Sequence, residues 1–517
     1  MEEPSGALAA VPRARCGRAA VKSGRNWQST GEGRPALAFR RGKGGPGWPF
    51  EGGGAGFPVG GRTAYTDRRH PAWWYLSELP QGRNAARVGE LFQVRGVSLF
   101  GHRPGQPPAP ASRKAHMTTP ATHPTADVVR VARNAVFTAF AINGAAFATF
   151  ASRVPDLKHQ LGLTAGQLGL TLLAASVGSV IGLPASGWFV HRFGAARTVV
   201  GGGAALSGGL LVVGLGLDVL HSWSGVMAGL FFLGLGIGTF DVAMNLEGAA
   251  VEQLLGRAIM PRFHAAFSGG TVVSALIGAA VSYLGIPIAV HLTGIVVVIA
   301  IVSPWFLRAF LPRSVEVDEQ GDVVRTKAGL RAAWLEPRTL LIGLVVLAAA
   351  FTEGTANDWV AVAFADGYDL PRWAGILGFA VFLAAMTGGR LLGTRILDRY
   401  GRVPVLRVLF VAAVVGCVLV VFGGAALAFV GAAVWGVGAS LGFPVGMSAA
   451  ADDPRRAAAR MSVVSTIGYL AFLGGPPLLG FLGDHIGVLR SLLAVGAMAA
   501  VALLVLPAVR EPAEPAR

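Results

Sequence analysis

Long stretches without charged residues dominate the second part of the chain. Residues 159–190, 265–307 and 408–451 contain no Asp, Glu, Lys or Arg. A helix that crosses a membrane needs about 20 apolar residues. Each of the two longest stretches therefore predicts two membrane spans joined by a tight turn, the first turn at residues 284–287 and the second at Gly423-Gly424.

The pattern as a whole predicts an all-α membrane protein with twelve transmembrane helices. A large soluble protein would need amphipathic surface helices between the apolar ones, and the sequence has almost none. The polar segment between Arg308 and Arg338 divides the spans into six and six, which suggests an internal duplication. The predicted spans lie near residues 132–152, 165–189, 197–217, 223–247, 264–284, 287–307, 339–360, 373–393, 405–422, 425–447, 461–482 and 489–508.

The distribution of Lys and Arg over the short loops predicts the orientation. Loops on one side of the membrane hold most of these residues, whereas the loops on the other side hold only Arg153, Lys158, Arg372 and Arg490. The positive-inside rule then places both termini in the cytoplasm of a plasma (inner) membrane protein. The predicted parts are a basic extension over 1–127, a six-helix half over 128–308, a cytoplasmic loop over 309–338, a second half over 339–510 and a tail over 511–517.

A turn with glycine and basic residues recurs after the second span of each half. Glycine allows a tight reversal, and an acid at this place can face a helix N-terminus, where the helix dipole favours negative charge. The simpler alternative is a charged loop that anchors two helices. The two candidate gate regions comprise Gly187, His191, Arg192, Gly194 and Arg197 in the first half and Arg390, Asp398, Arg399, Gly401 and Arg402 in the second.

These features together resemble the major facilitator superfamily of secondary transporters. The resemblance rests on the six-plus-six spans, the central loop and a G-x-x-x-D-R-x-G-R-R type loop after spans two and eight. The sequence departs from that pattern where His191 replaces the acid of the first copy and where Gly393 lies one place early in the second. If the acid helps to latch one conformation, the latch of the first half is in doubt.

Within the superfamily, the chain is similar to the group of membrane proteins that includes MosC and YbjJ. That resemblance implies uptake or exchange of a small polar solute. It rests on Asn143-Gly144, on Arg153-Val-Pro155, on Asp241-Val-Ala-Met-Asn245 with Glu252, on the segment from Met260 to Gly270, and on the segment from Glu353 to Trp359.

Two acids inside predicted spans are the candidates for proton coupling. Asp241 lies one turn before Asn245 in span four, and Glu353 lies one turn before Asn357 in span seven. A carboxylate inside the membrane costs about 2.5–3.5 kcal/mol on insertion scales, so we expect each to face the protein interior and to serve transport. The alternative is an acid held by a fixed partner such as His264 or Arg390, or one close to an aqueous end.

Other polar or aromatic side chains are expected to line a cavity between the halves. Asn143 needs a partner in the middle of a span, whereas Phe147 belongs to an aromatic stripe that packing alone could explain. His264 could equally be a satisfied histidine at a helix end. The candidates for contact with solute are Asn143, Phe147, Asn245, His264, Ser268, Asn357, Trp359 and Tyr469.

Composition and charge sharpen this interpretation. The net charge of +16 could indicate a nucleic-acid partner, but residues 1–116 carry 18 Lys and Arg against 7 Asp and Glu. No Met occurs between Met1 and Met117, so we expect translation to start at Met117, with a disordered extension as the alternative. Cys16 and Cys417 offer no disulfide framework or metal spacing.

The expected function is secondary active transport, not enzymatic catalysis. The sequence has no G-x-x-x-x-G-K-[ST] loop, and we expect no cofactor and no metal. The expected partners are the bilayer, a small solute and protons, with no nucleic acid and a monomeric chain. One alternative is proton-coupled efflux, although exporters of the superfamily typically carry a Gly-Pro motif in span five and an Arg in span four, which this chain lacks. The other is a membrane sensor that does not transport.

Overall fold

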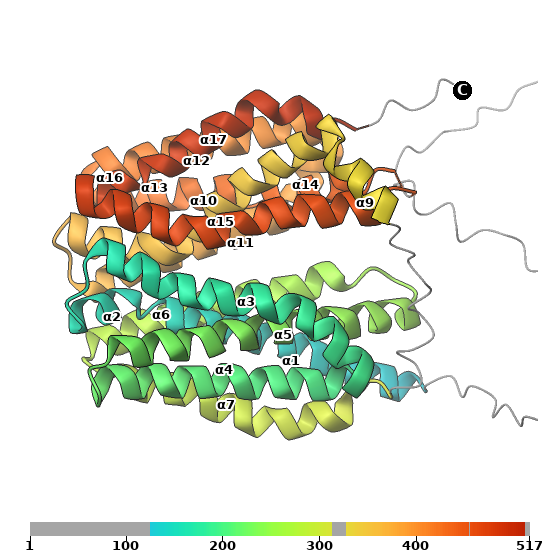
Figure 1. Cartoon of the computed structure of the whole chain (residues 1–517), viewed down its shortest axis with the longest axis horizontal. Coiled ribbons are helices and arrows are strands. Elements are labelled where there is room, and N and C mark those ends of the chain that lie inside the picture. The colour runs from blue at the N-terminus through green and yellow to red at the C-terminus, as the bar shows by residue number, and fades with distance from the viewer. Residues whose placement is uncertain (1–124, 313–326, 454, 512–517) are drawn as a thin grey trace, which may run out of the picture. The chain divides into compact units, whose positions relative to one another are not determined.

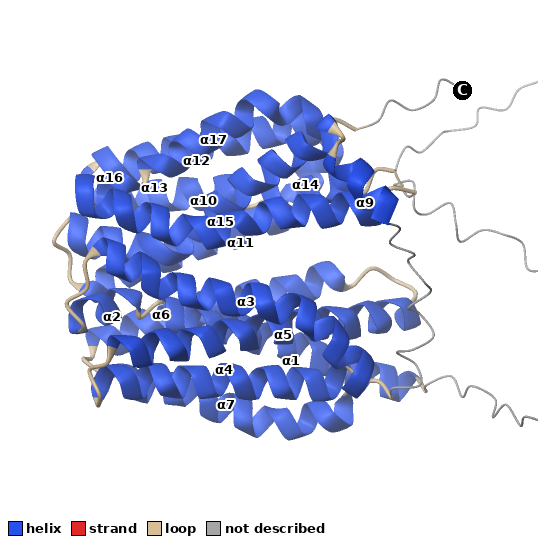
Figure 2. Cartoon of the chain, in the orientation of Figure 1, coloured by secondary structure: helices blue, strands red, loops and turns tan. Residues whose placement is uncertain are grey.

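The computed structural model describes residues 125–312, 327–453 and 455–511, which form helices and no strands (Figures 1 and 2). The basic extension before residue 125, the expected start at Met117, residues 313–326 of the central loop and the tail from residue 512 lie outside the described residues. The first half contains α1 (Ala126–Ala151), α2 (Val154–Gln160), α3 (Ala165–Phe193), α4 (Ala195–Asp218), α5 (Trp223–Leu255), α6 (Met260–Tyr283) and α7 (Ile288–Ala309).

The second half follows a short helix, α9 (Lys327–Trp334). Two of its spans are interrupted, because α13 and α14 together form one crossing and α16, α17 and η2 form another. Its elements are α10 (Pro337–Gly367), α11 (Arg372–Tyr400), α12 (Arg402–Phe422), α13 (Gly424–Ala439), α14 (Gly442–Ala450), α15 (Ala457–Ile486), α16 (Val488–Ser491), α17 (Leu493–Val505) and the 3₁₀ turn η2 (Leu506–Val509).

The twelve predicted spans are confirmed, since the described residues contain 12 helices long and apolar enough to cross a membrane. The two predicted turns are present as well, with Gly285 at φ 68° and Gly424 at φ 74°. Several helices are longer than predicted, such as α5, which continues to Leu255, and α10, which continues to Gly367. Hydropathy marks only the apolar length of a helix, whereas its backbone hydrogen bonds continue into the polar region outside the hydrocarbon.

Helices α3 and α15, together with α6 and α11, join the two halves of the bundle. We call the end of the bundle that contains α2, the α6–α7 turn and the α15–α16 turn the α2 end. We call the opposite end the α9 end, because α9 and the start of α10 lie there (Figure 1). The ribbons of the two halves approach each other at the α2 end and diverge toward the α9 end.

Glycines allow the helices of each half to pack with their backbones in close contact. A Cβ atom on Gly234 of α5 would overlap the carbonyl oxygen of Ala175 in α3.

We therefore expect Gly234→Leu to lower the free energy of unfolding by more than the usual overpacking cost of about 1–3 kcal/mol, because the obstructing atoms belong to the backbone. Thermal unfolding in detergent measures the loss. Gly201→Leu is the matched control, since a Cβ there meets nothing within 4 Å, and equal stability of the two variants would refute the packing argument.

Candidate functional site

An ion pair lies midway along the membrane-spanning part of the second half. Arg390 Nη2 of α11 lies 2.8 Å from Glu353 Oε2 of α10. Arg390 Nε also donates a hydrogen bond of 3.2 Å to the carbonyl oxygen of Ser440. The partner that the alternative interpretation of Glu353 named, Arg390, is thus in contact with it.

The break between α13 and α14 provides the Ser440 carbonyl. Pro444 has no N–H group, so it cannot bond the carbonyl four residues earlier, which is that of Ser440. Small residues bring α11 close to this break, because a Cβ on Gly389 would lie 2.7 Å from Ser440 Oγ and a Cβ on Gly436 would overlap the carbonyl oxygen of Phe382. A carbonyl freed within a span is tolerated where protein groups satisfy it.

The ion pair is not sealed by packing. The side chain of Glu353 is 21% exposed and that of Arg390 is 30% exposed. Charged groups at this depth of a membrane protein usually face the bundle interior or a water-filled cavity. We therefore expect the exposed part of the pair to face such an interior.

The second candidate acid, Asp241, is half-buried on α5. Asn245 Nδ2 donates a hydrogen bond of 2.8 Å to the Asp241 carbonyl oxygen and lies 3.4 Å from Asp241 Oδ1. The predicted spacing thus brings the two side chains together, but the amide donor of Asn245 is already used within its own helix.

Several buried amide and ring atoms have no hydrogen-bond partner among the described residues. Asn143 is 1% exposed with both amide atoms unpartnered, and the Asn357 Oδ1 atom is unpartnered as well. Trp359 is fully buried and its Nε1 has no partner. Unpaired buried polar atoms are costly, so such positions point to a missing water or ligand.

The remaining cavity candidates differ in exposure. His264 is exposed near the start of α6, with its ring edge-on to Phe140 at 5.1 Å. Ser268 is buried, whereas Phe147 and Tyr469 are half-buried. Within the ranges that the structure describes, no group of three His, Cys, Asp or Glu residues is placed to hold a metal ion.

The two candidate gate regions share one backbone geometry. Gly194 after α3 has φ 85° and ψ 162°, and Gly401 after α11 has φ 78° and ψ 170°. This likeness supports the internal duplication. The other members of the two regions differ in exposure. Gly194 is buried, and Arg390, Gly401 and Arg402 are half-buried. The exposed members are Gly187, His191, Arg192, Arg197, Asp398 and Arg399.

The two regions differ in the residue directly after the glycine. Arg402 comes after Gly401, and its Nη1 lies 2.7 Å from Asp452 Oδ1 at the end of α14. Ala195 comes after Gly194, so the first half has no counterpart of the Arg402 side chain.

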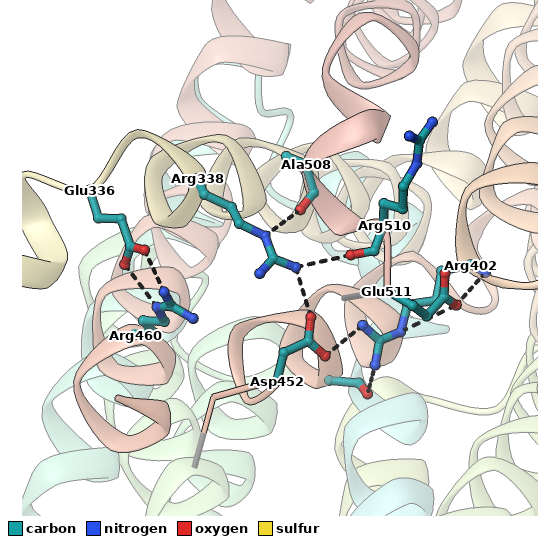
Figure 3. A network of polar contacts seen from close by, with 9 residues as sticks. Glu336, Arg338, Arg402, Asp452, Arg460, Ala508, Arg510 and Glu511 are labelled. Carbon is teal, nitrogen blue, oxygen red and sulfur yellow. Dashed lines mark hydrogen bonds and ion pairs between the residues drawn. The ribbon is translucent and has the colours of Figure 1, made fainter. Parts of the chain in front are cut away.

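Charged residues at the α9 end form a network that we call the C-half clamp, consisting of Glu336, Arg338, Arg402, Asp452 and Arg460 (Figure 3). Asp452, with a side chain only 6% exposed, lies between Arg402 and Arg338, whose Nη2 is 2.8 Å from Asp452 Oδ2. Arg338 also donates to the carbonyl oxygens of Ala508 and Arg510. The clamp therefore ties the starts of α10 and α12 to the ends of α14 and η2.

The sequence did not lead us to predict that Asp452 links two arginines of the C-half clamp. The available signal was its position as the first acid after the charge-free stretch that ends at residue 451. Its partners Arg338 and Arg402 lie 114 and 50 residues away in the chain, so no local spacing identified them.

Glu336 and Arg460 form the other part of the clamp. Arg460 Nε donates a hydrogen bond of 2.8 Å to Glu336 Oε2, and Arg460 Nη2 donates to Oε1. The hydrogen bond from Arg460 is the main cause that holds the pKa of Glu336 below its ordinary value of 4.5. This contact therefore stabilises the fold above pH 4.5, and its contribution is lost as the pH falls through the lowered pKa.

We accordingly expect the melting temperature of the wild-type protein to fall more steeply below pH 4.5 than that of Glu336→Gln. Glutamine keeps the shape of the side chain but is neutral, so it has no carboxylate that protonation could remove at low pH. A series of thermal unfolding curves at decreasing pH measures the difference. Parallel curves for the two proteins would show that Glu336 does not link folding to protonation.

Polar contacts at the α2 end also join the two halves. Lys158 Nζ of α2 is 2.6 Å from Asp366 Oδ2 of α10. Arg372 Nη1 of α11 is 3.2 Å from Asp156 Oδ1 of α2. We call these two contacts the cross-half pairs. Nearby, the Thr164 hydroxyl donates to Asp484 Oδ2, and the rings of Tyr283 and Trp373 meet edge-on at 5.6 Å.

Comparison with known proteins identifies the family that has this architecture. The sequence model of the Major Facilitator Superfamily matches residues 136–471 and 374–517. The chain belongs to the major facilitator superfamily. The resemblance found in the sequence is thereby confirmed, and the protein is a multi-pass membrane protein of a transporter family.

Relatives of this superfamily member come from bacteria. It is 32% identical over 352 residues to an uncharacterized MFS-type transporter of Yersinia pestis, covering 67% of this chain and 87% of that one. It is 30% identical over 376 residues to the uncharacterized transporter y4wD of Sinorhizobium fredii, covering 72% and 96%. It is also 25% identical over 374 residues to the membrane protein MosC of Rhizobium meliloti, covering 70% and 87%.

Solved transporters share the fold at low sequence identity. The nucleoside transporter NupG aligns with a TM-score of 0.60 at 15% identity, covering 74% of this chain and 99% of that one. The fucose:proton symporter FucP of E. coli aligns with a TM-score of 0.51 at 13% identity, covering 74% and 98%. At these identities the likeness concerns the fold alone.

Proposed function

We propose that this superfamily member is a secondary active transporter that takes up a small polar solute across the plasma membrane, driven by protons. The observation that carries the proposal is the Glu353–Arg390 pair, which lies midway through the second half and remains partly exposed. A stable fold does not need ions at this depth, because their transfer from water is costly. The pair is therefore retained for transport.

The contacts between the halves support alternating access. The cross-half pairs hold the halves together at the α2 end. Helices α3 and α15 are in backbone contact near that end, because a Cβ on Gly169 of α3 would overlap the carbonyl oxygen of Pro476 and a Cβ on Gly480 of α15 would overlap that of Ala165. Because the basic loops assign the α9 end to the cytoplasm, this is a conformation closed to the outside.

The ion pair suggests how a proton is coupled to the solute. Protonation of Glu353 neutralises its carboxylate and frees Arg390, which keeps its bond to the Ser440 carbonyl and can donate hydrogen bonds to an acceptor group of the solute. Release of the proton on the other side restores the pair and displaces the solute. Glu353 is the primary proton carrier in this scheme, and Asp241 beside Asn245 is the secondary candidate.

The unpartnered amides support a polar solute. Asn143 and Asn357 offer donors and acceptors in the two halves, and His264, Ser268 and Tyr469 add further polar groups. A fucose:proton symporter and a nucleoside transporter share the fold, which agrees with a hydroxyl-rich solute and with proton coupling. We infer a monomer as the working unit, since one chain contains both halves.

Uptake by vesicles tests the proposal. Purified protein in liposomes is supplied with radiolabelled sugars, polyols, nucleosides and organic acids, with and without a pH gradient, acid outside. We expect at least one solute to accumulate only with the gradient. Efflux instead of accumulation would favour the export alternative, and absence of any protein-dependent flux across the panel would favour a sensor.

A further inference from the structure

A hollow of about 390 Å³ lies at the α2 end, separate from the mid-membrane ion pair. Its polar lining comes from Arg153, Asp156, Gln160, Asp218 and Ser282 of the first half and from Arg372 of the second. Its volume is within the range of small-molecule sites.

Arg153 contributes a buried guanidinium group to the lining of the hollow. It is 5% exposed, its Nη2 donates 2.8 Å to the Ile286 carbonyl oxygen, and its Nε lies 3.1 Å from Asp156 Oδ2. Neither Nε nor Nη1 has a hydrogen-bond partner within the described part of the chain, because the contact of Nε with Asp156 is an ion pair without hydrogen-bond geometry. A buried guanidinium N–H without an acceptor is costly, so the hollow lacks an acceptor group at this point.

The acids of the hollow are already satisfied. Asp218 accepts the Ala289 N–H at 2.7 Å and the Gln160 side-chain amide at 2.9 Å, one bond on each oxygen. Asp156 lies between two guanidiniums, 3.1 Å from Arg153 Nε and 3.2 Å from Arg372 Nη1. The unmet demand is therefore that of the buried Arg153 N–H groups, which lie on one side of Asp156 while the half-exposed Arg372 lies on the other.

Asp156 itself shows which acceptor fits. Its carboxylate occupies the space between the two guanidiniums, so the spacing of Arg153 and Arg372 suits a carboxylate group. Guanidiniums bind carboxylates with paired, directional hydrogen bonds.

We propose that this hollow is a binding site for a small carboxylate solute, which reaches it from the α2 end and competes with Asp156 for Arg372. Arg153 Nη1 donates to the same solute. Because Asp156 and Arg372 belong to different halves, the solute replaces one of the two cross-half pairs and weakens the closure of this end, while Lys158–Asp366 remains. The effect on closure rests on the proposed alternating access, whereas the binding itself does not.

The probe for the test is malonate, with the neutral malonamide as its isosteric control. Saturation-transfer NMR on the purified full-length protein measures binding. We expect signal from malonate and none from malonamide. Arg153→Gln and, independently, Arg372→Gln should each weaken malonate binding by about tenfold or more, the loss of one charge-assisted hydrogen bond. If malonate gives no signal, or binds both folded variants as well as it binds the wild type, the site is refuted.

Spin labels measure the effect on closure. They are placed at the exposed positions Leu220 and Ile486, one in each half near the α2 end, after replacement of Cys16 by Ser and Cys417 by Ala. We expect malonate to increase the population of long label distances in the wild type and not in Arg372→Gln. Binding without a change in distance would refute competition with Asp156. Failure of the protein to transport any solute would leave both readouts intact, so the two proposals fail separately.

Discussion

Glu353→Gln is expected to abolish solute accumulation driven by a pH gradient while leaving solute exchange across the membrane intact. Glutamine keeps the size of the side chain and is neutral like the protonated glutamate, so Arg390 stays available to the solute, but it cannot load or release a proton. The accumulation ratio in liposomes should therefore fall to the equilibrium value, whereas counterflow of labelled against unlabelled solute should continue.

Asp127→Asn is the control for this experiment. Asp127 pairs with Arg130 through side chains that are 82% and 65% exposed, so removal of its charge should leave accumulation unchanged. Asp241→Asn separates the two candidate acids, because only the true proton carrier should show the combination of lost accumulation and retained counterflow. Gradient-driven accumulation by Glu353→Gln at the wild-type level would remove Glu353 from the coupling scheme.

Asp452→Ala is expected to cause the largest loss of stability among single charge removals in the second half. The variant leaves Arg402, whose side chain is 15% exposed, and Arg338 without their shared acceptor. Removal of the shared acceptor costs about 1–3 kcal/mol, since the partly buried Arg402 keeps only weaker contacts, with the Ser448 hydroxyl and with Glu511 at 3.8 Å. Thermal or denaturant unfolding of the protein in detergent measures the loss.

Asp398→Ala is the matched control for the clamp. Asp398 belongs to the same end of the molecule but is exposed, so its removal should change stability by no more than about 0.5 kcal/mol. Equal stability of the Asp452 and Asp398 variants would mean that the C-half clamp does not hold the ends of α10, α12 and α14 together.

The sequence predicted the membrane architecture well because its signal is strong and local. Stretches such as 265–307 exclude every charged side chain, and the left-handed glycines Gly285 and Gly424 mark the turns between paired spans. Helix ends were less predictable, as α5 shows, because hydropathy stops at the polar Glu247 whereas the helix continues to Leu255.

The candidate site was only partly predictable. Sequence spacing placed Glu353 and Asn357 on one helix and named Arg390 as a potential partner, but it could not choose between a free and a paired acid. That choice depends on the close approach of α11 to the break at Ser440, a tertiary feature whose only local sign is Pro444. Asp452, Arg338 and Arg402 come together across the chain, and no periodicity encodes such contacts.

The most direct test of proton-coupled solute uptake is simultaneous measurement of proton and solute movement. Liposomes that contain the protein and an internal pH indicator are held at zero membrane potential and are given the solute identified by the uptake panel. We predict that addition of the solute acidifies the interior in proportion to the solute taken up, and that Glu353→Gln takes up solute without acidification. Solute uptake by the wild type with no accompanying proton influx would contradict the proposed coupling.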